Sequence, residues 1–228
     1  MPEGPAVGTV RRSSLRQQIA DALRDEVLTG RMTAGRHFTV KEIAELYGVS
    51  ATPVREALVD LTAQGLLDVE HHRGFQVRRF TDAEFRSMVE ARTLVVEGIF
   101  RRVAARGMRE VDPQELASVR RRAEAAARAS RAGELEVLIG YDIRFWRELT
   151  ALADNAHVAE FLDRLRIQTW AYAVPYLRGR PDLAGLCWSG HVSLVTAIEE
   201  RDPETARRVV EEFDDHSLTL MRRLTTGR

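Results

Sequence analysis

The sequence feature that most constrains the fold is a four-residue break, Tyr47-Gly48-Val49-Ser50, between two short helical patterns. Gly48 can adopt the positive φ that a sharp turn requires, and Ser50 is a favourable N-cap for the second helix. Pro53 lies in the first turn of that helix, where its missing N–H costs little. Two helices joined by so short a turn within residues 38–67 predict a helix-turn-helix.

Apolar residues recur at helical spacing on both sides of the break and predict which faces pack against a core. The expected buried set consists of Ile43, Ala44, Leu46, Val54, Leu58 and Leu61. The opposite face of the second helix carries Ala51, Thr52 and Arg55. A small, polar and basic helical face of this kind fits into the major groove of DNA.

A helix and a hairpin flank this motif. An apolar stripe predicts a helix that begins near Leu15 and ends near Thr29-Gly30. After Gln64-Gly65, two short alternating runs on either side of 71–74 predict a β-hairpin. Its buried side is expected to carry Val69, Phe75 and Val77. Helix, helix-turn-helix and hairpin in this order make a winged helix-turn-helix.

The pattern changes beyond Phe80, where a capping-box sequence, Thr81-Asp82-Ala83-Glu84, starts a long helix. No strand-like alternation follows. Six helices are expected, with bounds near 81–106, 112–131, 134–152, 155–177, 183–201 and 203–224. The fold is therefore predicted to be mainly α, with an antiparallel C-terminal bundle of six to seven helices. The expected units are a disordered arm, a winged helix-turn-helix and an all-helical effector-binding and dimerisation domain, at 1–12, 13–79 and 80–228.

Composition narrows the class of protein. The chain of 228 residues has 34 Lys and Arg and 34 Asp and Glu, so its formal net charge is zero. Any basic surface that binds DNA must therefore be a local patch. One cysteine, Cys187, rules out an intramolecular disulfide and is interpreted as a buried, inert thiol in a helix. No run reaches the ~18 apolar residues of a membrane span, and no signal-peptide pattern is present. We therefore expect a cytoplasmic protein without a membrane partner.

The segment GVSATPVREALVDLTAQGLL, with KEIAELY before it and HHRGFQV after it, resembles the GntR-type winged helix of bacterial transcription regulators. The helical region is similar to the effector domain of the FadR subfamily, through ARTLVVEGIFRRVAA, YDIRFWRELTALADN and GHVSLVTAIEERDPETARRVVEEFDDHSL. Together these resemblances cover roughly residues 13–224. They imply a homodimer that binds a short palindromic operator in double-stranded DNA. They also imply that a small carboxylate-type metabolite changes this binding when it enters the helical domain.

The resemblance assigns DNA recognition to positions in the two helices and the wing, namely Lys41, Ser50, Thr52, Arg55, His71, His72 and Arg73. Family members usually have Arg directly after the Val-Ser pair, where this chain has Ala51. Arg can bind guanine in a bidentate manner, which is worth ~1–3 kcal/mol of discrimination, whereas a methyl group can only pack. The operator is therefore expected to differ from the usual one, or to be read less specifically at that base.

The resemblance also implies a candidate metal site. Asp142, His191 and His216 match three positions of an Asp/His/His/His cluster that holds a divalent metal such as zinc in many of these domains. The fourth position, one helical turn after Asp142, carries Trp146, whose indole nitrogen has no available lone pair. Three ligands can still bind zinc together with water or an effector. In the alternatives, the two histidines donate hydrogen bonds in a metal-free pocket or are satisfied interior residues.

Arg92 and Asn155 match positions associated with the effector pocket. Arg92 is the candidate carboxylate clamp, because a guanidinium group can bind both oxygens in a fork. The other candidate effector contacts are Trp146, His191 and His216. Glu97 is interpreted as a structural partner of an arginine in the bundle.

A ligand-responsive DNA-binding regulator without enzymatic activity is the leading interpretation. One alternative is a metal-dependent enzyme that activates water with Asp142, His191 and His216. Against it stand the missing fourth ligand, the absence of HExxH-like spacing and the lack of a convincing general base. The other alternative is a DNA-binding module whose helical bundle no longer senses a ligand.

Overall fold

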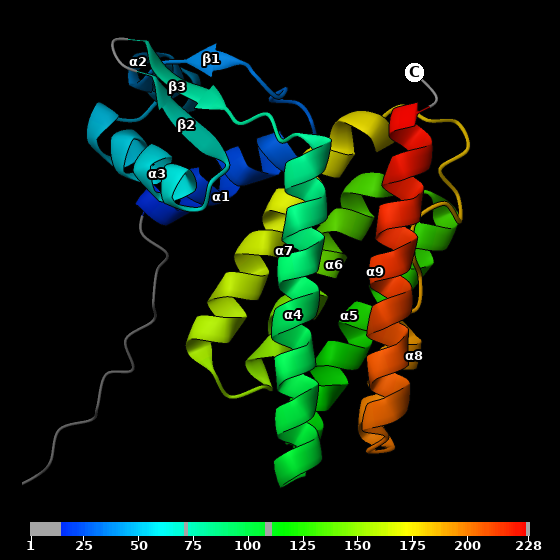
Figure 1. Ribbon diagram of the computed structural model, residues 1–228. Coiled ribbons are helices and arrows are strands. Elements are labelled where there is room, and N and C mark those ends of the chain that lie inside the picture. The colour runs from blue at the N-terminus through cyan, green and yellow to red at the C-terminus, as the bar shows by residue number, and fades with distance from the viewer. Residues whose placement is uncertain (1–14, 71–72, 108–110, 227–228) are drawn as a thin grey trace, which may run out of the picture.

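The computed structural model describes residues 15–70, 73–107 and 111–226 (Figure 1). Within these ranges the N-terminal part contains α1 (Leu15–Leu28), β1 (His37–Phe38), α2 (Val40–Tyr47), α3 (Ala51–Ala63), β2 (Leu67–Glu70) and β3 (Gly74–Val77). The remainder contains α4 (Asp82–Arg106), α5 (Pro113–Ala132), α6 (Leu135–Ala151), α7 (Ala156–Leu177), α8 (His191–Glu199) and α9 (Pro203–Thr226). The predicted fold class, a winged helix-turn-helix followed by a helical bundle, is confirmed. The predicted arm, residues 1–12, lies outside the described residues.

The turn between α2 and α3 has the predicted conformation. Gly48 ends α2 in the left-handed region at φ 64°, and its N–H donates to carbonyl groups of the last helical turn. Ser50 precedes α3 with extended backbone, but its side chain makes no capping hydrogen bond. Leu46 was expected in the core and is instead 68% exposed. At roughly 100° per residue, the buried face centred on Ile43 and Ala44 does not reach it.

The wing is a three-stranded antiparallel sheet with strand order β1-β3-β2. The hairpin is confirmed, whereas β1, whose Phe38 pairs with Phe75, was not predicted from its two residues. Phe75 and Val77 are buried as expected, but Val69 is 60% exposed. Because β2 is an edge strand, the covered positions belong mainly to the central strand β3.

Helix ends in the bundle follow the expected signals. Thr81 caps α4, because its hydroxyl accepts from the Glu84 N–H at 3.2 Å while the Glu84 carboxylate accepts from the Thr81 N–H at 2.7 Å. Asp112 caps α5, and Gly133 ends it in the left-handed region at φ 74°. Pro175 lies in the last turn of α7, which ends at Leu177.

One helix is shorter than predicted. The expected helix at 183–201 is represented by α8 alone, because residues 183–190 form a loop that includes Gly185 at φ 73°. Leu183 and Cys187 anchor this loop in the core. Cys187 is therefore buried, as expected, but in a loop. Burial raises the pKa of its thiol to about 11.

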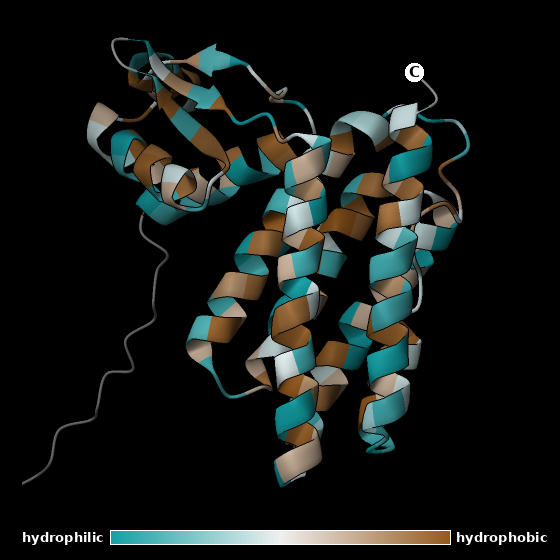
Figure 2. Cartoon of the chain, in the orientation of Figure 1, coloured by the Kyte–Doolittle hydropathy of each residue, from teal (hydrophilic) through white to brown (hydrophobic). Residues whose placement is uncertain are grey.

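One apolar cluster contains residues from both parts of the chain. Leu23 of α1 and Leu61 of α3 belong to the same buried cluster as Ile139, Ile143 and Ile167 of α6 and α7. Teal and brown segments alternate along α9 in Figure 2, as expected for a bundle helix with one exposed and one buried face. None of the described helices combines the length and apolar character needed to cross a bilayer.

We predict that Thr81→Ala lowers the free energy of unfolding by about 1 kcal/mol, the usual cost of losing an N-cap side chain. The Glu84 pKa is lowered to about 2, first by the hydrogen bond from the Thr81 N–H and then by Arg78. Stabilisation by the carboxylate is therefore complete above its ordinary pKa of 4.5 and lost as the pH falls towards 2. Urea unfolding between pH 7 and pH 3 measures both effects.

Ser87→Ala is the matched control, because Ser87 is an exposed position in the same helix. It should change stability by less than about 0.5 kcal/mol. Equal losses in the two variants would show that the cap does not stabilise α4.

Candidate functional site

Most of the residues predicted to contact DNA lie on the surface of α2 and α3. Lys41, Ala51 and Arg55 line one shallow groove between these helices. Ser50 and Thr52 are also exposed at the start of α3. The structure thus brings these predicted recognition residues together on one face, with a cationic side chain on each side of the groove.

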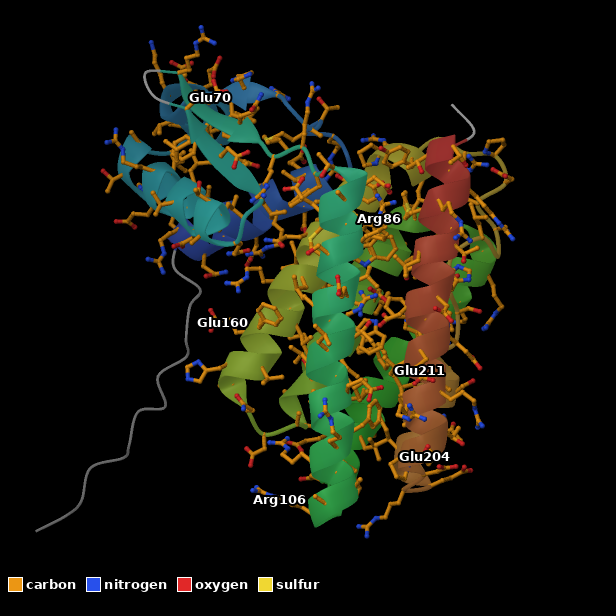
Figure 3. All side chains as sticks on the ribbon, viewed as in Figure 1. Glu70, Arg86, Arg106, Glu160, Glu204 and Glu211 are labelled. Carbon is orange, nitrogen blue, oxygen red and sulfur yellow. The ribbon has the colours of Figure 1, made fainter. Side chains whose placement is uncertain are left out.

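Arg73, the predicted DNA contact of the wing that the structure describes, is exposed, and its N–H donates to the Glu70 carbonyl at 3.1 Å. Glu70 is labelled at this edge of the molecule in Figure 3. The two wing histidines predicted to contact DNA, His71 and His72, lie outside the described residues.

A cluster of buried charged and polar side chains occupies the interior of the helical domain. Five helices each contribute one member, and each member is at most 6% exposed. The members are Arg92 of α4, Asp142 of α6, Arg166 of α7, His191 of α8 and Asp214 of α9. We call this set the buried charge cluster.

Arg92, the candidate carboxylate clamp, is bound by a carboxylate of the chain itself. Its Nε donates to Asp214 Oδ1 at 2.9 Å, and its Nη2 donates to the same oxygen. The Thr93 hydroxyl donates to Asp214 Oδ2 at 2.6 Å. Burial lowers the pKa of Arg92, an effect that the charge of Asp214 opposes. Arg92 therefore holds α4 to α9 before any ligand arrives.

Asp142 accepts hydrogen bonds on both carboxylate oxygens. Oδ1 accepts from Trp146 Nε1 at 3.0 Å and lies 2.9 Å from His191 Nε2. Oδ2 accepts from Trp170 Nε1 at 2.7 Å. Burial favours a higher pKa, but the charge of Arg166 and the hydrogen bond from His191 outweigh it and hold the pKa below its ordinary value. Asp142 is thus a carboxylate at neutral pH, and His191 Nε2 must be the donor.

Arg166 is the less fully occupied of the two buried arginines. Its Nη1 lies 3.8 Å from Asp142 Oδ2, and its Nε has no hydrogen-bond partner among the described residues. The guanidinium carbon, Cζ, lies 4.4 Å from the centroid of the Trp146 ring and 4.5 Å from that of the Phe213 ring. Burial lowers its pKa to about 9, so the group still carries its charge at neutral pH. Arg166 therefore offers a fixed positive charge between aromatic rings.

The proposed metal ligands do not fit a metal ion as they are arranged. Hydrogen bonds engage both oxygens of Asp142, and His216 Nε2 lies 3.0 Å from the Leu186 carbonyl oxygen. In the described ranges, no three His, Cys, Asp or Glu side chains are grouped closely enough to hold a metal. Trp146 contributes an N–H donor where the resemblance implies a lone pair. These side chains are therefore arranged as a hydrogen-bonded cluster of charged and polar groups.

The residues predicted to bind the effector lie at different places in the structure. Arg92, Asp142, Arg166, Trp170 and His216 line one cavity in the bundle, with about 570 Å³ of empty space that includes its opening to solvent. Asn155 is exposed and instead caps α7, where its side chain accepts from the Val158 N–H at 3.2 Å. Glu97 lies 3.8 Å from Arg207, in agreement with its structural interpretation.

Three members of the site were missed from the sequence, namely Arg166, Trp170 and Asp214. Arg166 and Trp170 are four residues apart on α7, a spacing that places them on one face. That spacing was a usable signal, but an Arg and a Trp in a long helix are equally compatible with a surface and a core position. Asp214 adjoins an identical residue, Asp215, but lies one helical turn after Val210 on the apolar stripe of α9, so helical spacing was a usable signal here too.

We predict that Asp214→Asn destabilises the protein by about 3–5 kcal/mol, because it leaves the Arg92 charge buried without its counter-ion. Thermal and urea unfolding measure the loss. The matched control is Glu211→Gln in the same helix, where Glu211 forms an exposed ion pair with Arg207 at 2.8 Å (Figure 3). That change should cost less than about 1 kcal/mol. Similar losses would refute the role assigned to the buried pair.

We also predict that zinc neither stabilises the protein nor remains bound after dialysis. A specific ion at 100 times its Kd adds about 2.7 kcal/mol of stability, or roughly 5–10 °C in the unfolding midpoint of a domain this size. Elemental analysis and unfolding midpoints with zinc or with chelator provide the measurement. One tightly held zinc per chain, with a midpoint that falls in chelator, would contradict the hydrogen-bonded arrangement.

Comparison with known proteins agrees with both parts of the structure. Residues 15–77 match the family described as "Bacterial regulatory proteins, gntR family", and residues 78–215 match the "FCD domain". The "Probable D-xylose utilization operon transcriptional repressor" of Paenarthrobacter nicotinovorans is 29% identical over 87% of this chain and 85% of its own length. The "HTH-type transcriptional regulator McbR" of Escherichia coli is 24% identical over 95% of this chain and 97% of its own length.

A solved structure extends this similarity to the fold. The structure of "E. coli McbR/YncC" superposes with a TM-score of 0.76 at 22% identity, and covers 93% of this chain and 99% of that chain. The FCD match alone spans more than half of the chain, and the gntR match covers the winged helix before it. The protein therefore belongs to the GntR family of bacterial transcription regulators, in the group that carries an FCD effector-binding domain.

Proposed function

We propose that the protein is a cytoplasmic homodimer that binds operator DNA through two winged helices and changes this binding when a small carboxylate enters the helical domain. The observation that carries the proposal is the core shared by the winged helix and the helices of the buried charge cluster. Ile143 of α6 follows Asp142 directly, and Ile167 of α7 follows Arg166 directly. Both isoleucines pack in the same cluster as α1 and α3.

This arrangement gives a ligand a mechanical route to the DNA-binding domain. A carboxylate that binds Arg166 competes with Asp142 for the guanidinium and biases the relative positions of α6 and α7. Close-packed cores respond to such shifts by moving whole elements, because few voids are available to absorb them. Two further contacts cross the junction: Gln168 Nε2 donates to the Gln64 carbonyl, and Arg178 Nη1 donates to the Thr29 carbonyl, each at 2.7 Å. The ligand thus selects one of two pre-existing arrangements.

The carboxylate class follows from charge. Arg166 is buried, stacked on aromatic rings and incompletely hydrogen-bonded, so an anionic oxygen is the complementary partner. Arg92, already bound to Asp214, supports the arrangement and does not act as the clamp. Arg166 and the aromatic rings beside it provide a positive charge and apolar walls, which serve to bind a ligand. We therefore propose a regulator without enzymatic activity, in preference to a metal-dependent enzyme at Asp142, His191 and His216.

Homodimerisation follows from the chemistry of DNA recognition. The formal net charge of the chain is zero, and one winged helix offers few cationic contacts, so a single copy would bind DNA weakly. A two-fold symmetric pair doubles the contacts and requires a palindromic operator.

We predict that Arg55→Ala weakens operator binding about 10-fold or more, since a guanidinium contact with a base is worth ~1–3 kcal/mol. The operator is first selected from random duplexes at moderate salt, and affinities are then measured by fluorescence anisotropy. Arg121→Ala, which removes an equal charge from an exposed position on α5, is the control and should bind as the wild type does. Failure to select any specific duplex would overturn the proposal.

The same selection with Ala51→Arg tests the recognition face directly. The variant should gain a preference for guanine at one position of each half-site, because its guanidinium can reach O6 and N7. An unchanged preference would show that Ala51 does not face a base.

A further inference from the structure

A second cavity lies in the bundle at the end away from the winged helix. The second half of α4, the end of α6, α8 and the start of α9 surround it (Figure 1). It contains about 880 Å³ of empty space, part of which is open to solvent. Its lining is aliphatic and aromatic, and includes Val96, Phe100, Val103, Leu149, Ile198 and Val210.

This cavity offers little to a polar occupant. The hydroxyl-bearing residue in its lining is Thr150, whose Oγ1 already donates to the Trp146 carbonyl at 2.8 Å. One nearby carbonyl, that of Ala153, accepts from Arg102. Water gains few hydrogen bonds in such a space, so a hydrocarbon or aryl group is the favoured occupant.

The apolar cavity adjoins a smaller cavity at the buried charge cluster. Val96, Trp146 and Val210 line it and also line a smaller cavity beside Arg92 and Arg166. Arg166 is 4% exposed, and its Nε has no hydrogen-bond partner in the part of the chain that the structure describes. The apolar cavity and the cavity beside the buried cation are therefore neighbours, and the Trp146 ring lines both of them.

We propose that the effector of this protein is an amphiphilic carboxylate, whose anionic group binds Arg166 and whose hydrocarbon or aryl part occupies the apolar cavity. The inference rests on the proposed function, in which a carboxylate enters the helical domain, and it adds the tail that such a ligand carries. A small, wholly polar acid would satisfy the guanidinium but leave the apolar cavity without an apolar occupant. A neutral hydrocarbon would fill the cavity but leave Arg166 Nε without a partner.

The test is a titration of the full-length protein at pH 7 with acetate, butanoate, hexanoate and octanoate, with octan-1-ol as the uncharged probe. Isothermal titration calorimetry or tryptophan fluorescence measures each Kd. Burial of one methylene group corresponds to about a fourfold gain in affinity. The Kd should therefore fall about fourfold per methylene until the cavity is full, and octanoate should bind at least 10-fold more tightly than octan-1-ol.

Two substitutions locate the two halves of the ligand. Val103→Phe puts a ring into the apolar cavity and should weaken octanoate binding at least 10-fold, whereas Ala104→Phe, at the exposed neighbouring position, should not. Arg166→Gln should reduce octanoate affinity to that of octan-1-ol. Circular dichroism and unfolding midpoints establish that each variant is folded. If Arg166→Gln does not fold, the comparison of octanoate with octan-1-ol in the wild type decides the same point.

Each outcome bears on one proposal or the other. If the short carboxylates bind and Kd does not depend on chain length, the amphiphile is wrong while the proposed carboxylate regulation stands. If no carboxylate binds, the carboxylate part of the proposed function fails as well. If octan-1-ol binds as tightly as octanoate, the role of Arg166 is wrong. If Val103→Phe alters sedimentation but not octanoate affinity, the cavity is an interface between copies of the chain and the inference is overturned.

Discussion

Two arginine–aspartate pairs, buried where five helices meet, are the interaction on which the helical domain depends. Arg92 joins α4 to α9 through Asp214, and Arg166 joins α7 to α6 through Asp142. Burying such charges is costly, and only good geometry and further hydrogen bonds offset that cost. The indole N–H groups of Trp146 and Trp170 supply those bonds to Asp142. An apolar cluster of equal volume could be as stable, so the charges are better explained by a need for a specific arrangement and a binding function.

In the proposed mechanism, the position of these pairs links ligand binding in the bundle to the winged helix. Asp142 and Arg166 belong to the buried charge cluster, while Ile143 and Ile167 beside them belong to the apolar cluster that also contains residues of α1 and α3. Because a helix is stiff, a displacement of the residues on its charged face also moves the residues on its apolar face. The same two helices therefore line the cavity proposed for the ligand and share an apolar cluster with the winged helix.

The sequence predicted the elements better than the interior site. Local signals were sufficient for the turn at Gly48, the cap at Thr81 and the breaks between helices, because each depends on a few neighbouring residues. The 183–190 loop was missed because its apolar residues have a helical spacing and yet anchor a loop. Val69 was misplaced because burial depends on which strand is central. Helical spacing could place Asp214 and Arg166 on an inward face, but it could not give their pairing, since their partners lie 122 and 24 residues away in sequence.

Trp146 connects the buried charge cluster with the apolar cavity. At the position where the resemblance implies a histidine ligand, its N–H binds Asp142, its ring covers the Arg166 guanidinium, and it lines the apolar cavity. The cation beside Asp142 is then a side chain of the chain itself, which does not depend on metal supply or on competing chelators. A guanidinium also binds an anion by directional hydrogen bonds and leaves the rest of the ligand to the surrounding walls. Discrimination between effectors then falls to the apolar walls, where Trp146 connects recognition of the charge with recognition of the tail.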